Sequence, residues 1–179
     1  MQLTVTPAGR YTPLARWLHW AVFVAVVLAY LFINLRGVFP RGSSAARVSM
    51  QGHILAGLVV LALVLPRLLQ RLRHAPLPAP AVAPWESALS RLTHLTLYAF
   101  LLVQPLLGLA TEWASGPLHI PFTALQIPSP LTPDHALKES LGNLHGTIGT
   151  VFYYVIGLHI AAALWHHFVR RESTLRRML

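Results

Sequence analysis

The chain contains no cysteine among its 179 residues, and this absence excludes every group that thiolates hold. Disulfides, iron–sulfur clusters, thiolate zinc sites and covalently attached c-type haem all require cysteine, the last within a C-x-x-C-H run. Any cofactor is therefore expected to be held by histidine nitrogen or by oxygen ligands.

Charged residues are scarce as well, at 11% of the chain against about 25% in a typical soluble domain. Hydrophobic residues make up 55% and the mean hydropathy is +0.56, which indicates a membrane protein. Since a spanning helix uses about 20 apolar residues, we expect four or five spans and no large extramembrane domain. The net charge of +9 would suggest a nucleic-acid partner for a soluble protein. Here the basic residues flank apolar runs, so we expect a lipid bilayer and no nucleic acid.

Four apolar runs predict the fold. They lie at about residues 14–35, 50–69, 88–111 and 141–169, within a single integral membrane domain over residues 1–179. Each run is long enough to span, so the prediction is an all-α, four-helix transmembrane bundle. We expect loops between the runs: a short Arg-rich segment over 35–49, a stiff proline-rich linker over 74–84 and a long proline-rich loop over 113–138.

The distribution of basic residues predicts the topology. Ten of the 14 Lys and Arg residues fall on one side of the predicted bundle and four on the other. By the positive-inside rule the richer side is cytoplasmic, so we expect both termini in the cytoplasm. The ten are Arg10, Arg16, Arg67, Arg71, Arg73, Arg91, Arg170, Arg171, Arg176 and Arg177, and the four are Arg36, Arg41, Arg47 and Lys138.

Ten histidines are unusual in such an apolar chain, because ionisable groups inside spans are costly and by default suggest function. His145 and His159 lie on the fourth span, 14 residues apart. At about 100° and 1.5 Å per residue they share one face to within about 40° and are separated by about 21 Å along the axis. One face of this span therefore carries an imidazole in each leaflet.

Each of these imidazoles has a partner at equal depth on another span. His53 matches His145 on the periplasmic side, and His19 or His94 matches His159 on the cytoplasmic side. Two such pairs are what two b-type haems require, because neutral imidazoles on facing helices ligate iron on both axial faces. The alternatives are interfacial anchoring of single histidines and ordinary packing of the small residues beside them. Zinc is disfavoured, because ligands in opposite leaflets cannot form one tetrahedron.

Six segments carry a resemblance that covers nearly the whole chain. They are RWLHW (16–20), RGVFPR (36–41), VSMQGHILAG (48–57), HLTLY (94–98), VIGLHIAAALWHH (155–167) and STLRRM (173–178). In these segments the chain resembles the bacterial cytochrome b561 family of four-helix, di-haem membrane proteins, and within it the superoxide:ubiquinone oxidoreductase type. The resemblance implies two haem b groups, ubiquinone as electron acceptor and a location in the bacterial inner membrane.

The resemblance also implies which histidines bind haem. His19 and His159 are expected to ligate the iron of the cytoplasmic-side haem, and His53 and His145 that of the periplasmic-side haem. Bis-histidine ligation fills both axial positions, so oxygen could not bind either iron and electron transfer would be outer-sphere.

Two further histidines match the quinone pocket of that family. His94 and His166 are expected near the cytoplasmic-side haem without ligating it. An imidazole there can hydrogen-bond a quinone carbonyl or transfer a proton, because histidine titrates near neutral pH.

Three arginines form a cluster on the periplasmic side. Arg36, Arg41 and Arg47 lie within one short segment that contains no acid, against the positive-inside bias. Such a cluster over a low-dielectric mouth attracts anions and raises their on-rate by about 10- to 1,000-fold. Superoxide is an anion, so we expect these arginines to steer it. The alternative is that they bind lipid headgroups or are simply solvated.

Two functions remain open. In the first, superoxide donates electrons at the periplasmic face, and two electrons and two protons reduce ubiquinone, with no protein partner required. In the second, the chain is a cytochrome b membrane anchor and electron relay for a partner dehydrogenase or hydrogenase. The RGVFPR segment and the absence of an extended docking domain favour the first.

Overall fold

Four long helices dominate the computed structural model, which describes residues 10–73 and 83–179. They are α1 Pro13–Val38, α2 Ser44–Arg73, α3 Pro84–Trp113 and α4 His135–Leu164. A two-stranded antiparallel hairpin, β1 Leu118–His119 and β2 Gln126–Ile127, lies between α3 and α4, and a π-helical turn, η1 Trp165–Val169, follows α4. The predicted all-α, four-helix fold is confirmed.

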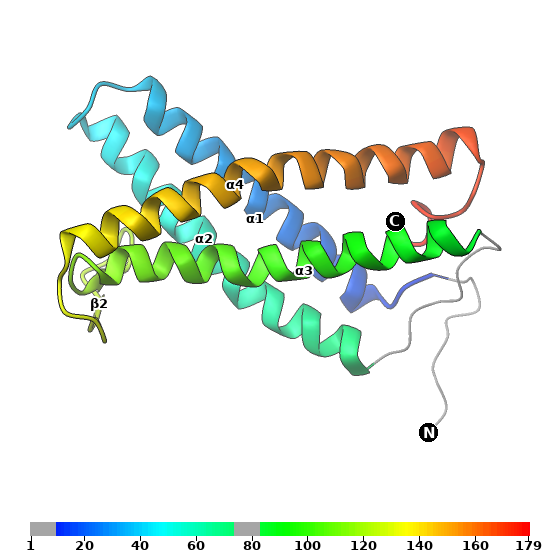
Figure 1. The fold of residues 1–179 in the computed structure, drawn as a ribbon, viewed down its shortest axis with the longest axis horizontal. Coiled ribbons are helices and arrows are strands. Elements are labelled where there is room, and N and C mark those ends of the chain that lie inside the picture. Colours follow the sequence, from blue (N-terminus) through cyan, green and yellow to red (C-terminus); the bar gives the residue numbers. More distant parts are fainter. Residues whose placement is uncertain (1–9, 74–82) are drawn as a thin grey trace.

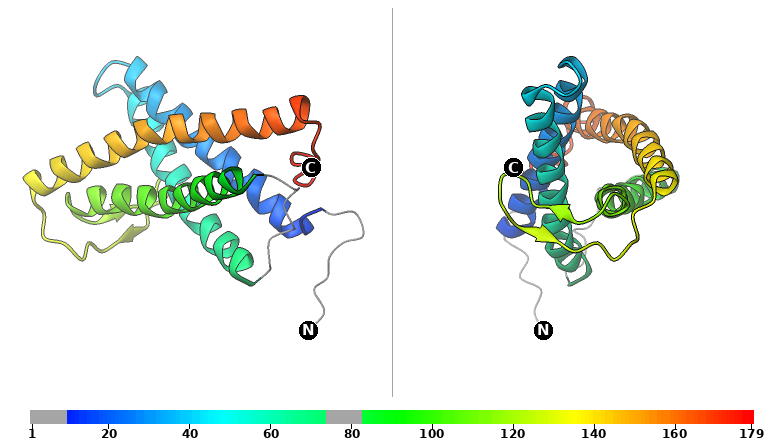
Figure 2. Two further views of the ribbon diagram at one scale, coloured as in Figure 1. Left: turned by 45° about the vertical axis from the view of Figure 1, so that its right-hand side comes forward. Right: turned by 90° about the vertical axis from the view of Figure 1, so that its left-hand side faces the viewer.

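The helices form two hairpins that cross one another (Figure 1). α1 packs along α2 and α3 along α4, while α2 and α3 contact each other between the hairpins. Figure 2 shows the α1–α2 pair and the α3–α4 pair side by side in the end-on view. Residues 39–43 and 114–134, which connect the helices of each pair, lie at one end of the molecule, called here the loop end. The start of α1, the end of α2, the start of α3 and residues 165–179 lie at the opposite end, called the terminal end.

Helix caps, rather than the limits of the apolar runs, set where α2 and α4 begin. Ser43 Oγ accepts a hydrogen bond from the Ala46 N–H at 3.2 Å, and Asp134 Oδ1 accepts one from the Leu137 N–H at 3.1 Å. Both helices start six residues before the predicted spans at 50 and 141. The apolar run predicts which residues lie in the bilayer, whereas the capping residue determines where the helix begins. The segment 35–49, expected to be a loop, is consequently helical except for residues 39–43.

The long proline-rich connection is more structured than expected. Predicted as a loop over 113–138, it is restricted to residues 114–134 and contains the β1–β2 hairpin. The Ile120 N–H donates to the Leu125 carbonyl at 2.9 Å, and Phe122 closes the turn with a φ of 62°. Strands of two residues are too short for a periodic pattern to reveal. The predicted stiff linker over 74–84 lies outside the described residues except for its last two positions.

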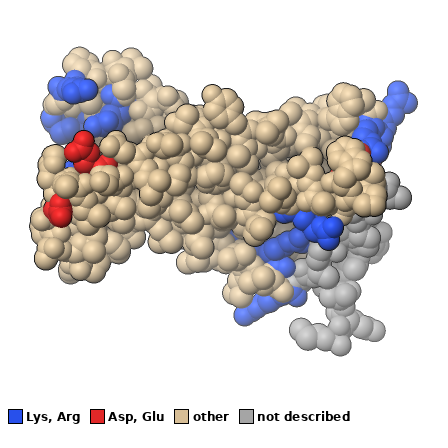
Figure 3. All heavy atoms as spheres, viewed as in Figure 1, with Lys and Arg blue, Asp and Glu red and all other residues tan. Residues whose placement is uncertain are grey.

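The helices expose apolar side chains on most of their surface. In the described chain no residue of α3 is buried, and only Phe152 of α4 is. In Figure 3, Lys and Arg gather at the two ends of the molecule with a largely uncharged band between them. All four helices are long and apolar enough to cross a membrane. This surface suits a lipid environment, in which helices satisfy their own backbone hydrogen bonds.

A close approach of α1 and α2 gives the first prediction. A Cβ at Gly52 would lie 2.8 Å from two atoms of the Phe32 ring, so Gly52→Ala forces an aromatic side chain to move. Overpacking of this kind costs about 1–3 kcal/mol. We expect a lower midpoint of thermal unfolding in detergent, followed by circular dichroism. Gly37→Ala is the control, because a Cβ there meets nothing within 4 Å, and equal midpoints for the two variants would contradict the close approach.

Candidate functional site

Two imidazoles meet near the loop end. His53 of α2 and His145 of α4 have ring centroids 5.9 Å apart and planes at 83°. Equal depth on two spans led us to expect this proximity. A metal–imidazole nitrogen bond is about 2 Å, so two rings bound on opposite sides of one metal would have centres about 6 Å apart. The spacing therefore fits two axial ligands of one haem iron.

Both rings of this pair are held by a backbone carbonyl. His53 Nδ1 lies 2.8 Å from the carbonyl oxygen of Ala29 on α1, and His145 Nδ1 lies 3.1 Å from that of Gln104 on α3. Because a carbonyl only accepts, each Nδ1 carries the proton and each Nε2 keeps its lone pair. This arrangement fixes the tautomer that metal-binding histidines use.

A missing side chain makes room for the His145 ring. A Cβ at Gly108 of α3 would lie 3.1 Å from His145 Cε1 and 3.5 Å from its Nδ1. A Cβ at position 108 would therefore require the His145 ring to shift by a few tenths of an ångström. The residues present thus fit a haem held between His53 and His145.

Three imidazoles gather near the terminal end. His94 of α3 and His159 of α4 have ring centroids 5.9 Å apart and planes at 76°. His94 Nδ1 donates to the Ser90 carbonyl at 2.7 Å, so it has the same tautomer as the loop-end pair. His19 of α1 is the third and is close enough to His94 and His159 for electrostatic interaction.

One ring nitrogen of His19 is hydrogen-bonded to an arginine. Arg67 Nη2 lies 3.0 Å from His19 Nδ1, and the Arg67 guanidinium lies 5.7 Å from the centre of the Tyr98 ring. Since a guanidinium only donates, His19 Nδ1 accepts and the proton is on Nε2. His159 has its ring contact with His94, and His19 lies close enough to both of them for electrostatic interaction. The expected ligand pair His19 and His159 stays a prediction.

The two histidines expected at the quinone have different partners. His94 contacts Ser90 and His159, as described above. His166 lies in η1, where its Nδ1 donates to Glu172 Oε2 at 2.8 Å. Glu172 also pairs with Arg170 at 3.3 Å, and Arg170 reaches Glu86 at the start of α3 at 2.7 Å.

The three arginines expected to steer an anion lie around the α1–α2 turn. Arg36 is in the last turn of α1, Arg41 in the turn itself and Arg47 in the first turn of α2, and all three are exposed. Arg47 Nη1 donates to the carbonyl of Gly42, whose φ of 82° favours glycine. The turn therefore has a defined backbone conformation, and its three arginines are exposed.

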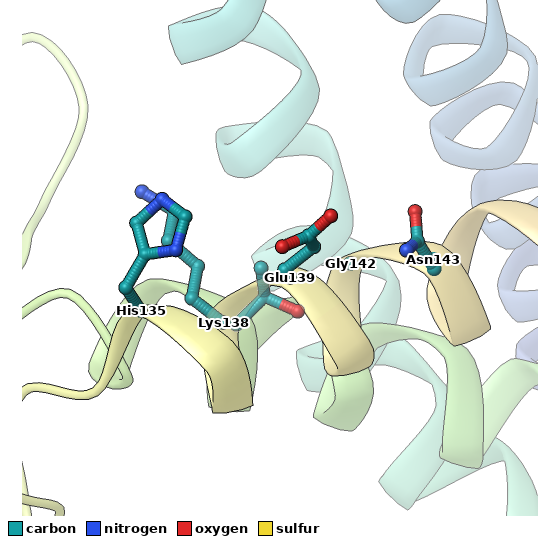
Figure 4. Close-up of a pocket in the computed structure, with 6 residues that line it drawn as sticks. His135, Lys138, Glu139, Gly142 and Asn143 are labelled. Carbon is teal, nitrogen blue, oxygen red and sulfur yellow. The ribbon is translucent and has the colours of Figure 1, made fainter.

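A cleft opens at the same end between α3 and α4 (Figure 4). It has a volume of about 400 Å³, and its lining on α4 ends two residues before His145. Its charges are mixed, because Lys138 and Glu139 both line it. The remaining lining residues are Thr111, His135, Gly142 and Asn143. Sequence reasoning did not identify this cleft.

Sequence reasoning also missed three polar residues that contact the histidines: Arg67, Gln104 and Glu172. Two of them carried a detectable signal. Arg67 interrupts the end of an apolar run, and Gln104 is an amide within the third run, where polar side chains are costly. Glu172 follows the last span, where a carboxylate is unremarkable.

The chain is similar to known proteins over nearly its whole length. Residues 10–179 match the family model described as prokaryotic cytochrome b561. The chain is 33% identical over 172 residues to cytochrome b561 homolog 1 of Escherichia coli K12, covering 96% of this chain and 97% of that protein. It is 32% identical over 174 residues to the probable superoxide oxidase CybB of Yersinia pestis, with coverage of 95% and 96%. Cytochrome b561 homolog 2 of Escherichia coli K12 is 26% identical over 189 residues, covering 100% of this chain and 95% of that protein.

Proposed function

Because the chain belongs to the prokaryotic cytochrome b561 family, and is thus a multi-pass membrane protein that transfers electrons through b-type haem, we propose that it oxidises superoxide and reduces ubiquinone. The family expected from the sequence motifs is confirmed. The relative from Yersinia pestis, at 32% identity, is named probable superoxide oxidase. In the proposed reaction, two superoxide anions lose one electron each and leave as dioxygen. The two electrons and two protons convert one ubiquinone to ubiquinol.

The observation that carries the proposal is the His53–His145 pair at the arginine-bearing end. Two imidazoles have ring centroids 5.9 Å apart, and each has its Nδ1–H on a backbone carbonyl, so both Nε2 atoms would be free to hold one iron. Haem b bound there supplies a one-electron carrier. With both histidines bound, the iron would have no site open to oxygen species, so superoxide would deliver its electron without coordination.

We propose two haem b groups, held by four histidines. His53 and His145 would hold the iron near the loop end, and His19 and His159 the iron near the terminal end. For His19 this requires Arg67 to move from Nδ1, because the ligating tautomer needs Nε2 unprotonated.

The proposed orientation has the loop end in the periplasm and both termini in the cytoplasm of a bacterial inner membrane. The described part of the loop end carries Arg36, Arg41, Arg47 and Lys138, whereas the described part of the terminal end carries ten Lys and Arg residues. This imbalance follows the positive-inside rule. Superoxide would then arrive from the periplasm, and the arginines would raise its encounter rate.

Two histidines at the terminal end, one on α3 and one in η1, supply the quinone contacts in this proposal. His94 and His166 would hydrogen-bond a quinone carbonyl or transfer protons to it. Glu172 keeps His166 oriented, because its carboxylate accepts from Nδ1 at 2.8 Å.

Replacing His166 should separate the quinone step from haem binding. We expect His166→Ala to keep both haems and fast haem reduction by superoxide, and to slow haem reoxidation by ubiquinone by about 10²- to 10⁴-fold, the range for losing a proton-transfer group. Stopped-flow absorbance of the haem bands measures both rates. Reoxidation at the wild-type rate would count against His166 as a quinone contact.

The overall proposal is tested on the purified protein without partners. Given a steady source of superoxide and a soluble ubiquinone, it should produce ubiquinol, and superoxide dismutase should abolish the reaction. A relay for a partner dehydrogenase would be reduced by chemical reductants but would show no turnover with this pair. That result would replace the oxidase proposal with the relay.

A further inference from the structure

Gln104 and His145 are joined by two hydrogen bonds in opposite directions. The His145 Nδ1–H donates to the backbone carbonyl of Gln104 at 3.1 Å. The side-chain amide of Gln104 donates in return, from Nε2 to the backbone carbonyl of His145 at 2.7 Å. The pair fixes both the height and the rotation of the imidazole relative to α3, because one bond holds the ring and the other holds the backbone beneath it.

Two glycines leave the space that this arrangement needs. A Cβ at Gly149, one turn further along α4, would lie 2.9 Å from Gln104 Nε2. A Cβ at Gly108, one turn further along α3, would lie 3.1 Å from His145 Cε1. The carbonyl of Gly149 also accepts from the Tyr30 hydroxyl of α1 at 2.8 Å. Three helices therefore converge on the turn of α4 that follows His145.

The second polar atom of the Gln104 amide has no partner of its own. Its Oε1 is buried and without a hydrogen bond in the described part of the chain. An unpaired buried acceptor is costly and calls for a role. In a low-dielectric interior the partial negative charge on this oxygen interacts more strongly with a nearby charge than it would in water.

We propose that Gln104 is a positioning residue that lowers the reduction potential of the haem held by His53 and His145. This inference rests on the proposed function, because it requires that haem. The side-chain amide of Gln104 holds the α4 backbone where the His145 Nδ1–H reaches the backbone carbonyl of Gln104. A hydrogen bond from Nδ1–H to a carbonyl makes an imidazole a stronger donor to iron, which favours the oxidised state. The amide oxygen adds negative potential with the same sign. A lower potential at the haem nearest superoxide directs the electron onward to the second haem.

The test is potentiometric titration of the purified holoprotein in detergent. Gln104→Leu keeps the volume of the side chain but removes its donor and its acceptor. We expect one of the two haem components to shift upward, by about tenfold in its oxidised-to-reduced ratio or about 59 mV for one electron. Its low-spin electron paramagnetic resonance signal should change as well, while the other haem keeps its potential and both haems stay bound.

A second variant disturbs the hydrogen bond between the Gln104 amide and the His145 carbonyl without altering Gln104. In Gly149→Ala the new methyl group meets the far end of the Gln104 amide, so the upward shift should recur in the same component. Gln70→Leu is the matched control. It makes the same chemical change on α2 at the terminal end, where the Gln70 amide donates to Thr12 at 2.6 Å, and both potentials should stay unchanged.

The outcomes separate this inference from the proposed function. The shifted component should be the one that is missing in His53→Ala. Two bound haems with unchanged potentials and resonance signals in Gln104→Leu and Gly149→Ala would overturn the role of Gln104 alone, as would equal shifts of both haems. A wild-type protein that binds no haem at this pair would overturn the proposed function itself. If Gln104→Leu does not fold, Gly149→Ala decides.

Discussion

Replacing His53 or His145 by alanine should remove one haem and leave the other, and replacing His19 or His159 should remove the second haem and leave the first. Each variant deletes one of the two imidazoles proposed to hold an iron, and bis-histidine ligation of haem b needs both. Haem content per chain and the reduced absorption spectrum of the four variants measure the loss. His119→Ala is the control, because His119 is exposed in β1 and both haems should stay bound.

His94 makes this experiment decisive at the terminal end. Its ring lies 5.9 Å from that of His159, whereas His19 accepts a hydrogen bond from Arg67. If His94→Ala loses a haem while His19→Ala retains two, α3 supplies the ligand and the pairing carried over from the family is wrong. If His94→Ala keeps two haems, Arg67 must leave His19 when haem binds. Both results are read from the same haem assay.

The helices and the depths of the histidines could be predicted because both depend on short-range patterns. The length of an apolar run shows whether it can span the bilayer, and the depth of a residue within the span follows from the rise per residue. His53 and His145 lie at equal depth, and their rings are in fact neighbours. The same reasoning gave His19 and His94 as equally good partners for His159.

The choice among partners at equal depth could not be predicted, because it depends on how each helix is rotated about its axis. Rotation is set by packing between helices, such as the contact of Gly52 with Phe32 that draws α1 onto α2. Hydropathy carries little of this information when nearly every face of a helix is apolar. The capping bonds at Ser43 and Asp134, and the two-way bond between Gln104 and His145, belong to the same class of geometric detail.

Neutralising the arginines of the α1–α2 turn should slow superoxide oxidation without loss of haem. Arg36, Arg41 and Arg47 are exposed around one short turn, and a cation cluster of this kind raises the on-rate of an anion by about 10- to 1,000-fold. We expect the triple Arg→Gln variant to lose at least about tenfold in the rate of haem reduction by superoxide at low salt. The rate with a neutral reductant should barely change, because none of the three is a proposed ligand.

Charges elsewhere at the loop end make the prediction sharper. Glu112, Asp134 and Glu139 lie on or near the α3–α4 connection, so the positive potential is concentrated on the α1–α2 side of that end rather than spread over it. Neutralising Glu139, which lines the cleft before His145, should therefore raise the superoxide rate. The opposite signs expected for the two changes exclude a general loss of folding as the cause.

Salt dependence and a control at the other end separate a local field from net charge. The wild-type rate should fall as the Debye length shrinks from about 30 Å at 0.01 M to about 10 Å at 0.1 M, and the triple variant should respond much less. A control that replaces Arg73, Arg91 and Arg176 with Gln removes the same charge at the terminal end and should keep the wild-type rate. A loop-end variant that still reacts at the wild-type rate at low salt would mean that these arginines anchor the turn among lipid headgroups. These arginines would then not attract superoxide, and an electron relay for a partner dehydrogenase or hydrogenase would become the better explanation of what this chain does.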